Sequence, residues 1–166
     1  MPAGDEVDWR EGRGKARSIG DRYKLYYSGG GRSKNGVAIC LGEEWQDKVI
    51  ATERKSDRIM SLRLVTPDRT YNVVSTYAPQ QGCEDAEKER FWNQLDTLTR
   101  IVPENEELIL AGDVNGYVGK DGSEEWARWH GGKSAGSRNE EGELILDFVW
   151  RKCWDENIWR KRLQNM

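Results

Sequence analysis

The segment spanning residues 108–115 constrains the fold of this chain more than any other. A short apolar run stops at Gly112 and delivers a carboxylate and an amide two residues apart, at Asp113 and Asn115. The run is too short for a buried helix and is typical of a buried strand. Because side chains alternate along extended chain, Asp113 and Asn115 are expected to point the same way. A charged acceptor beside a neutral donor is what a metal-assisted phosphoryl-transfer site uses to hold water and an oxyanion.

Length and composition indicate one domain that is large enough to bury a hydrophobic core. The chain has 166 residues, of which 36% are hydrophobic and 33% charged, and its mean hydropathy is -0.88. Eight Trp and six Tyr argue against disorder, which is poor in aromatic residues. No apolar run approaches the roughly 20 residues of a membrane helix, and residues 1–11 are acidic and glycine-rich, unlike a signal peptide. We therefore expect no membrane association and an intracellular location.

Charge and cysteine content exclude further classes of protein. The formal net charge of -3 is not the global basic field that favours nucleic acid, and local basic clusters are interpreted as solvated faces and turns. The three cysteines, Cys40, Cys83 and Cys153, are widely spaced and form no CxxC pair. This pattern favours a reducing compartment and offers no zinc site.

Periodicity along the chain predicts strands, then a helix, then another strand. Strand composition at residues 22–28 and 36–41, joined by a glycine loop, indicates one hairpin, and residues 58–65 and 71–76 indicate a second. Helical spacing begins near Glu84 and ends before Pro103, and a last helix is expected to begin near Asn139. This order predicts an α+β fold with a mostly antiparallel sheet. We divide the chain into a loosely packed lead-in (1–20), a partial domain (21–148) and a basic-aromatic tail (149–166).

A second informative segment is residues 75–79, where a strand ends before Pro79. Tyr77 is expected at a strand tip, because the proline biases Ala78 toward extended chain. A phenol at this place can donate a hydrogen bond to a phosphate oxygen without adding charge. Taken alone, Tyr77 also fits an edge-packed aromatic residue, and the Gly-Asp-x-Asn element also fits an Asx turn.

Three other chemical interpretations fail or stay weak. A calcium loop that begins at Asp113 would need an oxygen ligand where Tyr117 stands and a glycine where Val118 stands. The Gly-Lys-Ser sequence at 132–134 lacks the upstream glycine of a P-loop, because Ala127 occupies that position. His130, the only histidine, is interpreted as a structural hydrogen-bonding residue in a loop.

Taken together, the motifs resemble the endonuclease/exonuclease/phosphatase family, whose members cleave phosphate esters with a divalent metal. The closer resemblance is to the endonuclease domains of RTE-type LINE retrotransposons and to host relatives of the craniofacial development protein 2 type. The match covers about residues 9–148. The segments that carry it are 23–30, 35–39, 57–60, 77–79, 91–92, 112–115, 138–140 and 142–148.

This resemblance implies a fold and a set of roles. The fold is a four-layered α/β sandwich in which two sheets pack face to face with helices outside. Tyr77 is implied to contact the scissile phosphate, Asp113 to orient or deprotonate the attacking water, and Asn115 to hydrogen-bond the phosphate. Mg²⁺ is the implied cofactor and DNA the implied partner, with a nuclear location.

The chain also departs from the family pattern. The strands that open and close the family's domain are not found, so we expect a domain truncated at both ends. The resemblance then implies a retroelement-derived, endonuclease-like domain whose ancestral function is Mg²⁺-dependent hydrolysis of DNA phosphodiesters. Glu6, three residues before Trp9, is the candidate metal ligand, although Asp5 stands where the family has glutamine. The alternatives left open are a catalytically inactive module that binds nucleic acid or protein, and a product with no selected function.

Overall fold

The computed structural model describes residues 15–29, 35–119 and 136–153. The chain divides into two compact units. The first comprises Met1–Ala78 and Glu89–Asp113, and the second comprises Pro79–Lys88 and Val114–Met166. The boundary after Asp113 therefore falls inside the Gly-Asp-x-Asn element, and each unit is described by itself.

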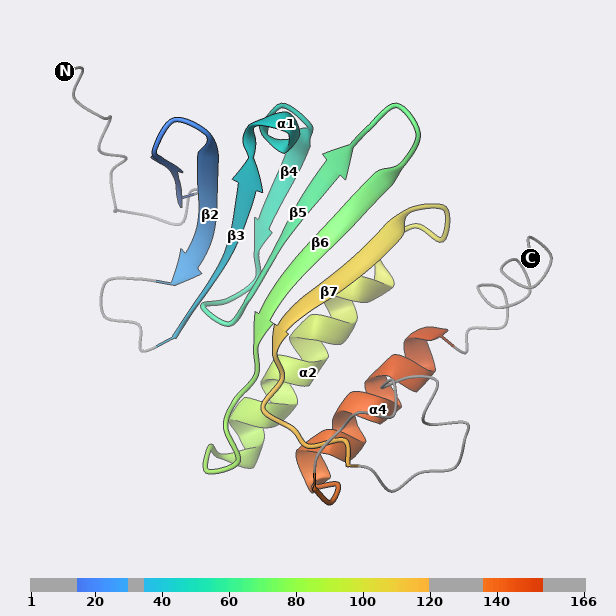
Figure 1. Ribbon diagram of the computed structural model, residues 1–166. Helices are drawn as coiled ribbons and strands as arrows, with labels where there is room; N and C mark the ends of the chain where they lie inside the picture. The colour runs from blue at the N-terminus through green and yellow to red at the C-terminus, as the bar shows by residue number, and fades with distance from the viewer. Residues whose placement is uncertain (1–14, 30–34, 120–135, 154–166) are drawn as a thin grey trace. The chain divides into compact units, whose positions relative to one another are not determined.

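The first unit contains two β-sheets (Figure 1). The smaller sheet is antiparallel and has the order β1-β2-β3. The larger has the order β4-β5-β6-β7, in which β6 and β7 pair in parallel and the other neighbours pair antiparallel. The strands are β1 (Lys15–Ile19), β2 (Tyr23–Gly29), β3 (Gly36–Gly42), β4 (Val49–Arg54), β5 (Ile59–Val65), β6 (Thr70–Tyr77) and β7 (Glu107–Asp113), with a short helix α1 (Glu43–Gln46) after β3.

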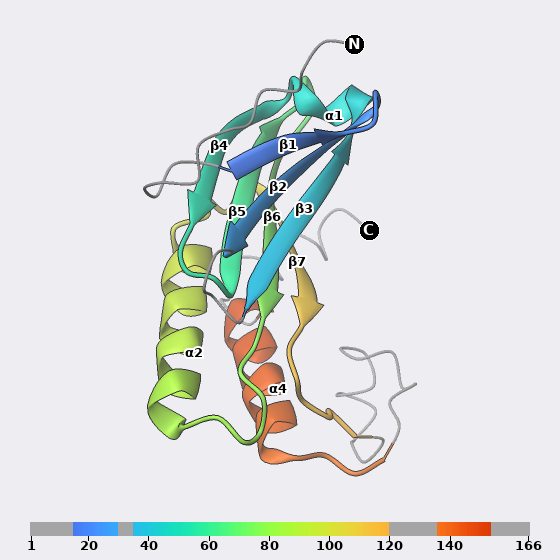
Figure 2. The same cartoon turned by 90° about the vertical axis from the view of Figure 1, so that its left-hand side faces the viewer.

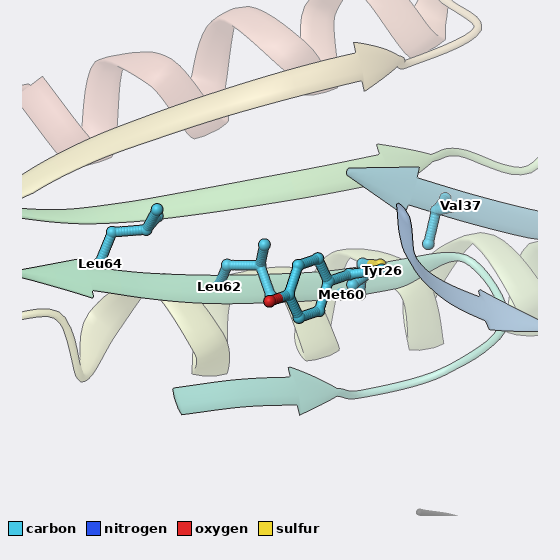
Figure 3. Close-up of a cluster of buried hydrophobic side chains, with 5 residues drawn as sticks. All are labelled: Tyr26, Val37, Met60, Leu62 and Leu64. Atoms are coloured by element: carbon cyan, nitrogen blue, oxygen red, sulfur yellow. The ribbon is translucent and has the colours of Figure 1, made fainter. Parts of the chain in front are cut away.

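A hydrophobic core lies between the two sheets. Alternation along β5 places Met60, Leu62 and Leu64 on one face, where they meet Tyr26 and Val37 of the smaller sheet (Figure 3). Met60 and Leu62 are fully buried, so this contact excludes water. Figure 2 shows the smaller sheet lying across the larger one, with α2 on the larger sheet's other side.

Helix α2 (Asp85–Arg100) provides the crossover between β6 and β7. Parallel neighbours cannot be joined by a tight turn, so a connection of this length is required. Its part in the first unit buries Phe91, Leu95 and Leu98, which recur at helical spacing. Leu98 also lines a cavity of about 270 Å³ with Ser61 and Arg63, which occupy the face of β5 opposite the core.

The α+β prediction is confirmed, as are both hairpins, the helix before Pro103 and the existence of a strand at Leu108. The prediction that this last strand is buried is wrong, because β7 is the outermost strand of its sheet and Leu108 and Ile109 are 36% and 45% exposed. The sequence did not predict β1, which lies within the segment expected to be loosely packed, nor α1 and β4. Strand β1 was missed because its charged sequence does not alternate between apolar and polar residues, and it forms by pairing with β2. Strand β4 was missed because its pairing with β5 is interrupted by a register shift between Val49 and Ala51. The four-layered arrangement stays a prediction.

A buried carboxylate precedes β7. Arg63 donates two hydrogen bonds to Glu106, one of them from Nε to Oε2 at 2.9 Å, and Asn72 Nδ2 donates to the same oxygen at 2.8 Å. The Glu106 side chain is only 7% exposed. The hydrogen bonds from Arg63 and then Asn72 lower the pKa of Glu106 from 4.5 to about 2. This network links β5 and β6 to the start of β7.

The lowered pKa of Glu106 predicts how stability depends on pH. An acid whose pKa is lower in the folded state favours folding above its usual pKa of 4.5, and this contribution disappears as the pH falls toward about 2. We expect Glu106→Gln to flatten the dependence of the unfolding free energy on pH between these values, as measured by urea unfolding. Glu107→Gln, which removes the neighbouring half-buried carboxylate, provides the control. An unchanged dependence on pH between 4.5 and about 2 in Glu106→Gln would contradict the assignment.

Candidate functional site

Two of the predicted site residues lie side by side at one edge of the larger sheet. Tyr77 is the last residue of β6 and Asp113 the last residue of β7, and they are register partners in the parallel pair. The backbone N–H of Ala78 continues this pairing by donating to the carbonyl of Asp113 at 2.8 Å. Asp113 is exposed and Tyr77 is half-buried. The edge therefore presents an accessible carboxylate beside a phenol.

Arg58, just before β5, holds the end of β6. Its Nη1 donates to the carbonyls of Tyr77 at 3.2 Å and of Ala78 at 3.4 Å. Its guanidinium carbon lies 5.3 Å from the centre of the Tyr77 ring, and its carbonyl accepts from the Tyr77 N–H at 2.9 Å. Sequence reasoning placed Arg58 in a motif without giving it a role.

The loop that carries Arg58 is also bound to the smaller sheet. Ser28 Oγ donates to the carbonyl of Ser56 at 2.6 Å, and Asn35 Nδ2 donates to Asp57 Oδ2 at 3.0 Å. Both contacts join residues at the end of β2 or the start of β3 to the loop before β5. The sequence does show polar residues at the ends of these strands. Their contacts with the loop before β5 could be predicted only once it is known which strands pair.

Gly112 is required for the approach of β7 to β6. Its φ is +146°, and a Cβ added there would lie 1.9 Å from the carbonyl oxygen of Thr76. No side chain fits at that distance, so the glycine of the Gly-Asp-x-Asn element is explained by packing. Gly112 therefore allows β7 to stay paired with β6 up to Asp113, the last residue of β7.

We expect Gly112→Ala to lower the unfolding free energy by on the order of 3 kcal/mol, from backbone strain and the clash with Thr76 together. Urea unfolding measures this loss. Gly20→Ala is the matched control, because Gly20 also has a positive φ, +59°, but no atom within 4 Å of an added Cβ. The control should cost only about 1 kcal/mol. Equal losses in the two variants would mean that close packing at Gly112 is unimportant.

Asn115 belongs to the second unit, which begins again at Val114. Its φ is +49°, a left-handed conformation that asparagine tolerates better than most residues. The extended chain therefore ends before Asn115, and strand alternation does not set the direction of its side chain as the sequence predicted. Gly116 then packs closely on α4 (Glu140–Cys153), because a Cβ added there would lie 2.8 Å from the backbone nitrogen of Gly142. The backbone around Asn115 is therefore fixed by contacts inside the second unit.

Asn139 connects the start of α4 to this segment. Its Oδ1 accepts from the N–H of Gly142 at 2.9 Å, which caps the helix, and from the N–H of Tyr117 at 2.8 Å. Its own N–H donates to the carbonyl of Tyr117 at 3.1 Å. One side chain thus satisfies two backbone donors, one in the helix and one two residues after Asn115.

A buried ion pair adds to this contact. Lys88 Nζ lies 3.0 Å from Glu141 Oε1, and the two side chains are 18% and 7% exposed. The hydrogen bond from Lys88 lowers the pKa of Glu141, and the same bond raises the pKa of Lys88. Glu141 also accepts from Asn139 Nδ2 at 2.9 Å, so the ion pair and the helix cap form one network.

We expect Asn139→Ala to expose the amides of Tyr117 and Gly142 to faster hydrogen exchange. Loss of a helix cap costs about 1–2 kcal/mol, which corresponds to roughly tenfold less protection. The measurement is residue-resolved amide exchange. Asn93→Ala, at an exposed position in the middle of α2, is the control and should leave both amides unchanged. Unchanged protection in Asn139→Ala would contradict the proposed double acceptor.

The remaining predicted residues are not described. Glu6, His130 and the segment 154–166 of the basic-aromatic tail lie outside the described residues, whereas residues 149–153 continue α4. Within the described ranges, no three or more His, Cys, Asp and Glu residues gather as metal ligands. Mg²⁺ is often held by only one or two carboxylates together with water and phosphate, so the exposed carboxylate of Asp113 suits such a hard cation. None of the helices in the described ranges is long and apolar enough to cross a membrane.

The molecule is thus an α+β protein with a carboxylate and a phenol at the shared ends of two parallel strands. No family model matches the chain. It is 33% identical over 144 residues to craniofacial development protein 2 of Tragulus javanicus and 31% identical over 144 residues to that of Bos taurus. These matches cover 86% of the chain but only 24% and 23% of the relatives, so the chain spans about a quarter of their length.

A further similarity is to a transposon protein. The chain is 35% identical over 81 residues to the transposon TX1 uncharacterized 149 kDa protein of Xenopus laevis, a match that covers 48% of the chain and 6% of that protein. The chain is therefore homologous both to craniofacial development protein 2 and to a transposon protein. Assignment to the RTE type stays a prediction.

Proposed function

We propose that this chain is a retroelement-derived, endonuclease-like domain of the endonuclease/exonuclease/phosphatase family that hydrolyses DNA phosphodiesters with Mg²⁺. The observation that carries the proposal is the register pairing of Tyr77 with Asp113 at an accessible sheet edge. Ligands of sheets with parallel strands bind outside the carboxyl ends of those strands, where both residues lie. The similarity to a transposon protein supports the retroelement origin.

In this proposal each residue has a separate task. Asp113 orients the attacking water and accepts its proton, since a carboxylate is an acceptor only. Tyr77 donates its phenolic proton as a hydrogen bond to a phosphate oxygen, and Asn115 donates from its amide as negative charge develops there. Glu6 would hold Mg²⁺, and the bound ion would supply charge neutralisation at the phosphate and at the leaving oxygen.

The proposal extends to the rest of the fold and to location. The two face-to-face sheets and the packing of α2 on the larger sheet support the four-layered sandwich expected of this family. A DNA substrate implies action where DNA is present, and we include a nuclear location in the proposal.

The test is nicking of supercoiled plasmid in the presence of Mg²⁺, with chelator as the first control. We expect Asp113→Ala to lower the rate at least about 100-fold, because a positioned base contributes that much. Tyr77→Phe should lower it about 10- to 100-fold through loss of one hydrogen bond to the phosphate. Asp68→Ala removes an exposed aspartate from the turn at the other end of β6, and should leave the rate unchanged.

Two outcomes would contradict the proposal. Cleavage that needs no metal, or that survives Asp113→Ala, would come from a different site or from a contaminant. A folded chain that does not nick but binds DNA with strong salt dependence would instead be the inactive binding module.

A further inference from the structure

The side chain and backbone of Arg58 together hold the backbone where β6 leaves the sheet. The Tyr77 N–H is taken by the carbonyl of Arg58, and the carbonyls of Tyr77 and Ala78 are both taken by its Nη1. The Ala78 N–H is taken by Asp113, and Pro79 has no N–H to satisfy. Every backbone donor and acceptor from Tyr77 to Ala78 is therefore engaged, and three of the four contacts are made with Arg58.

The Tyr77 ring is held as well. Tyr77 is partly buried and packs against the buried cluster between the sheets, which includes Met60. The guanidinium of Arg58 lies 5.3 Å from the ring centre, which is within the range of a cation–π contact. A ring held by an apolar cluster and a planar cation loses rotational freedom before any ligand binds, which is what preorganisation requires.

Arg58 is itself fixed by its surroundings. Its N–H lies 3.2 Å from Ser56 Oγ, and the N–H groups of Lys55 and Ser56 both donate to the carbonyl of Ile59, at 3.0 and 3.2 Å. The contacts of Ser28 and Asn35 then bind the same loop to the smaller sheet. The guanidinium is thus presented from a loop that both sheets hold.

We propose that Arg58 is a positioning residue that holds the Tyr77 phenol in the geometry needed at the scissile phosphate. This inference rests on the proposed function and deepens it, because it names what sets the orientation of one of the phosphate-binding groups. The role requires arginine in particular. Its planar group can bond two carbonyls and lie against a ring at once, whereas a lysine ammonium is a compact point charge on a flexible stem.

The first experiment reads the Tyr77 ring without using activity. The chain is labelled with 3-fluorotyrosine, and the signal of Tyr77 among the six tyrosines is assigned as the one missing in Tyr77→Phe. We expect Arg58→Met, which keeps an apolar stem and removes the charge, to shift and broaden the ¹⁹F signal of Tyr77. Arg58→Lys should shift it less. An unshifted Tyr77 signal in Arg58→Met would overturn the inference whether or not the chain cuts DNA.

The matched control for that experiment is Arg69→Met. Arg69 precedes the first residue of β6, so it lies at the opposite end of that strand, and it is exposed and paired with Glu107 at 2.7 Å. Arg69 has the same charge as Arg58 and also lies beside a strand end, but it lies at the end of β6 away from Tyr77. If Arg69→Met shifted the Tyr77 signal as much as Arg58→Met does, the effect would be a general loosening of the sheet, and the inference would fail.

The second experiment separates positioning from substrate binding. In plasmid nicking, Arg58→Met should lower kcat about 10- to 100-fold, as small misplacements of catalytic groups do, with little change in KM. Introduced into Tyr77→Phe, it should cause almost no further loss, because the hydroxyl that it positions is already gone. A full additional loss in the double variant would show that Arg58 acts by another route, and would overturn the inference.

The two readouts keep this inference distinct from the proposed function. If Arg58→Met shifts the ¹⁹F signal but the wild-type chain does not nick DNA, the proposed function fails. The catalytic positioning role of Arg58 then fails too, although its contact with the Tyr77 ring is confirmed. If the wild type nicks DNA and the signal does not move, the proposed function stands and the inference alone fails.

Discussion

The parallel pairing of β6 with β7 is the constraint on which the rest of the candidate site depends. Its register brings Tyr77 and Asp113 to the same edge, with Tyr71 opposite Glu107 at the other end. A slip of one residue would turn the Asp113 side chain to the opposite face of the sheet, because the side-chain period of a strand is two. The close approach at Gly112, the crossover through α2 and the anchoring of Glu106 by Arg63 all maintain this one register.

The middle of the larger sheet and the end that carries Asp113 are stabilised by different interactions. In the middle, β5 supplies fully buried apolar side chains, and the burial of Leu62 against the smaller sheet stabilises the face-to-face packing. Toward the edge that carries Asp113, side-chain hydrogen bonds replace apolar contacts, because backbone groups beyond the last strand residue need new partners. The contacts of Ser28 and Arg58 supply them. Polar residues are therefore structurally necessary at this edge, in addition to any chemical task.

Much of this arrangement could be predicted from local sequence. The apolar run before Gly112 and the proline after Ala78 predicted two strand ends, and each prediction needed only a short segment. The parallel neighbour of β6 could not be predicted that way, since periodicity does not say which strands pair. Arg58 was missed for the same reason, because its role depends on β5 lying beside β6. A helix cap at Asn139 could be predicted, because asparagine is a preferred capping residue. The hydrogen bond that Asn139 accepts from Tyr117 could not, because it depends on tertiary contacts.

The boundary after Asp113 has a consequence for how such a site can change. Asp113 is fixed by strand pairing in the first unit, whereas the backbone around Asn115 is fixed by Gly116 and Asn139 in the second. The two side chains are separated by one residue, Val114, but their positions depend on different sets of contacts. Substitutions on α4 can therefore alter the amide without loosening the sheet that holds the carboxylate. Sequence change in one unit therefore acts on one of these two side chains while the contacts that hold the other stay in place.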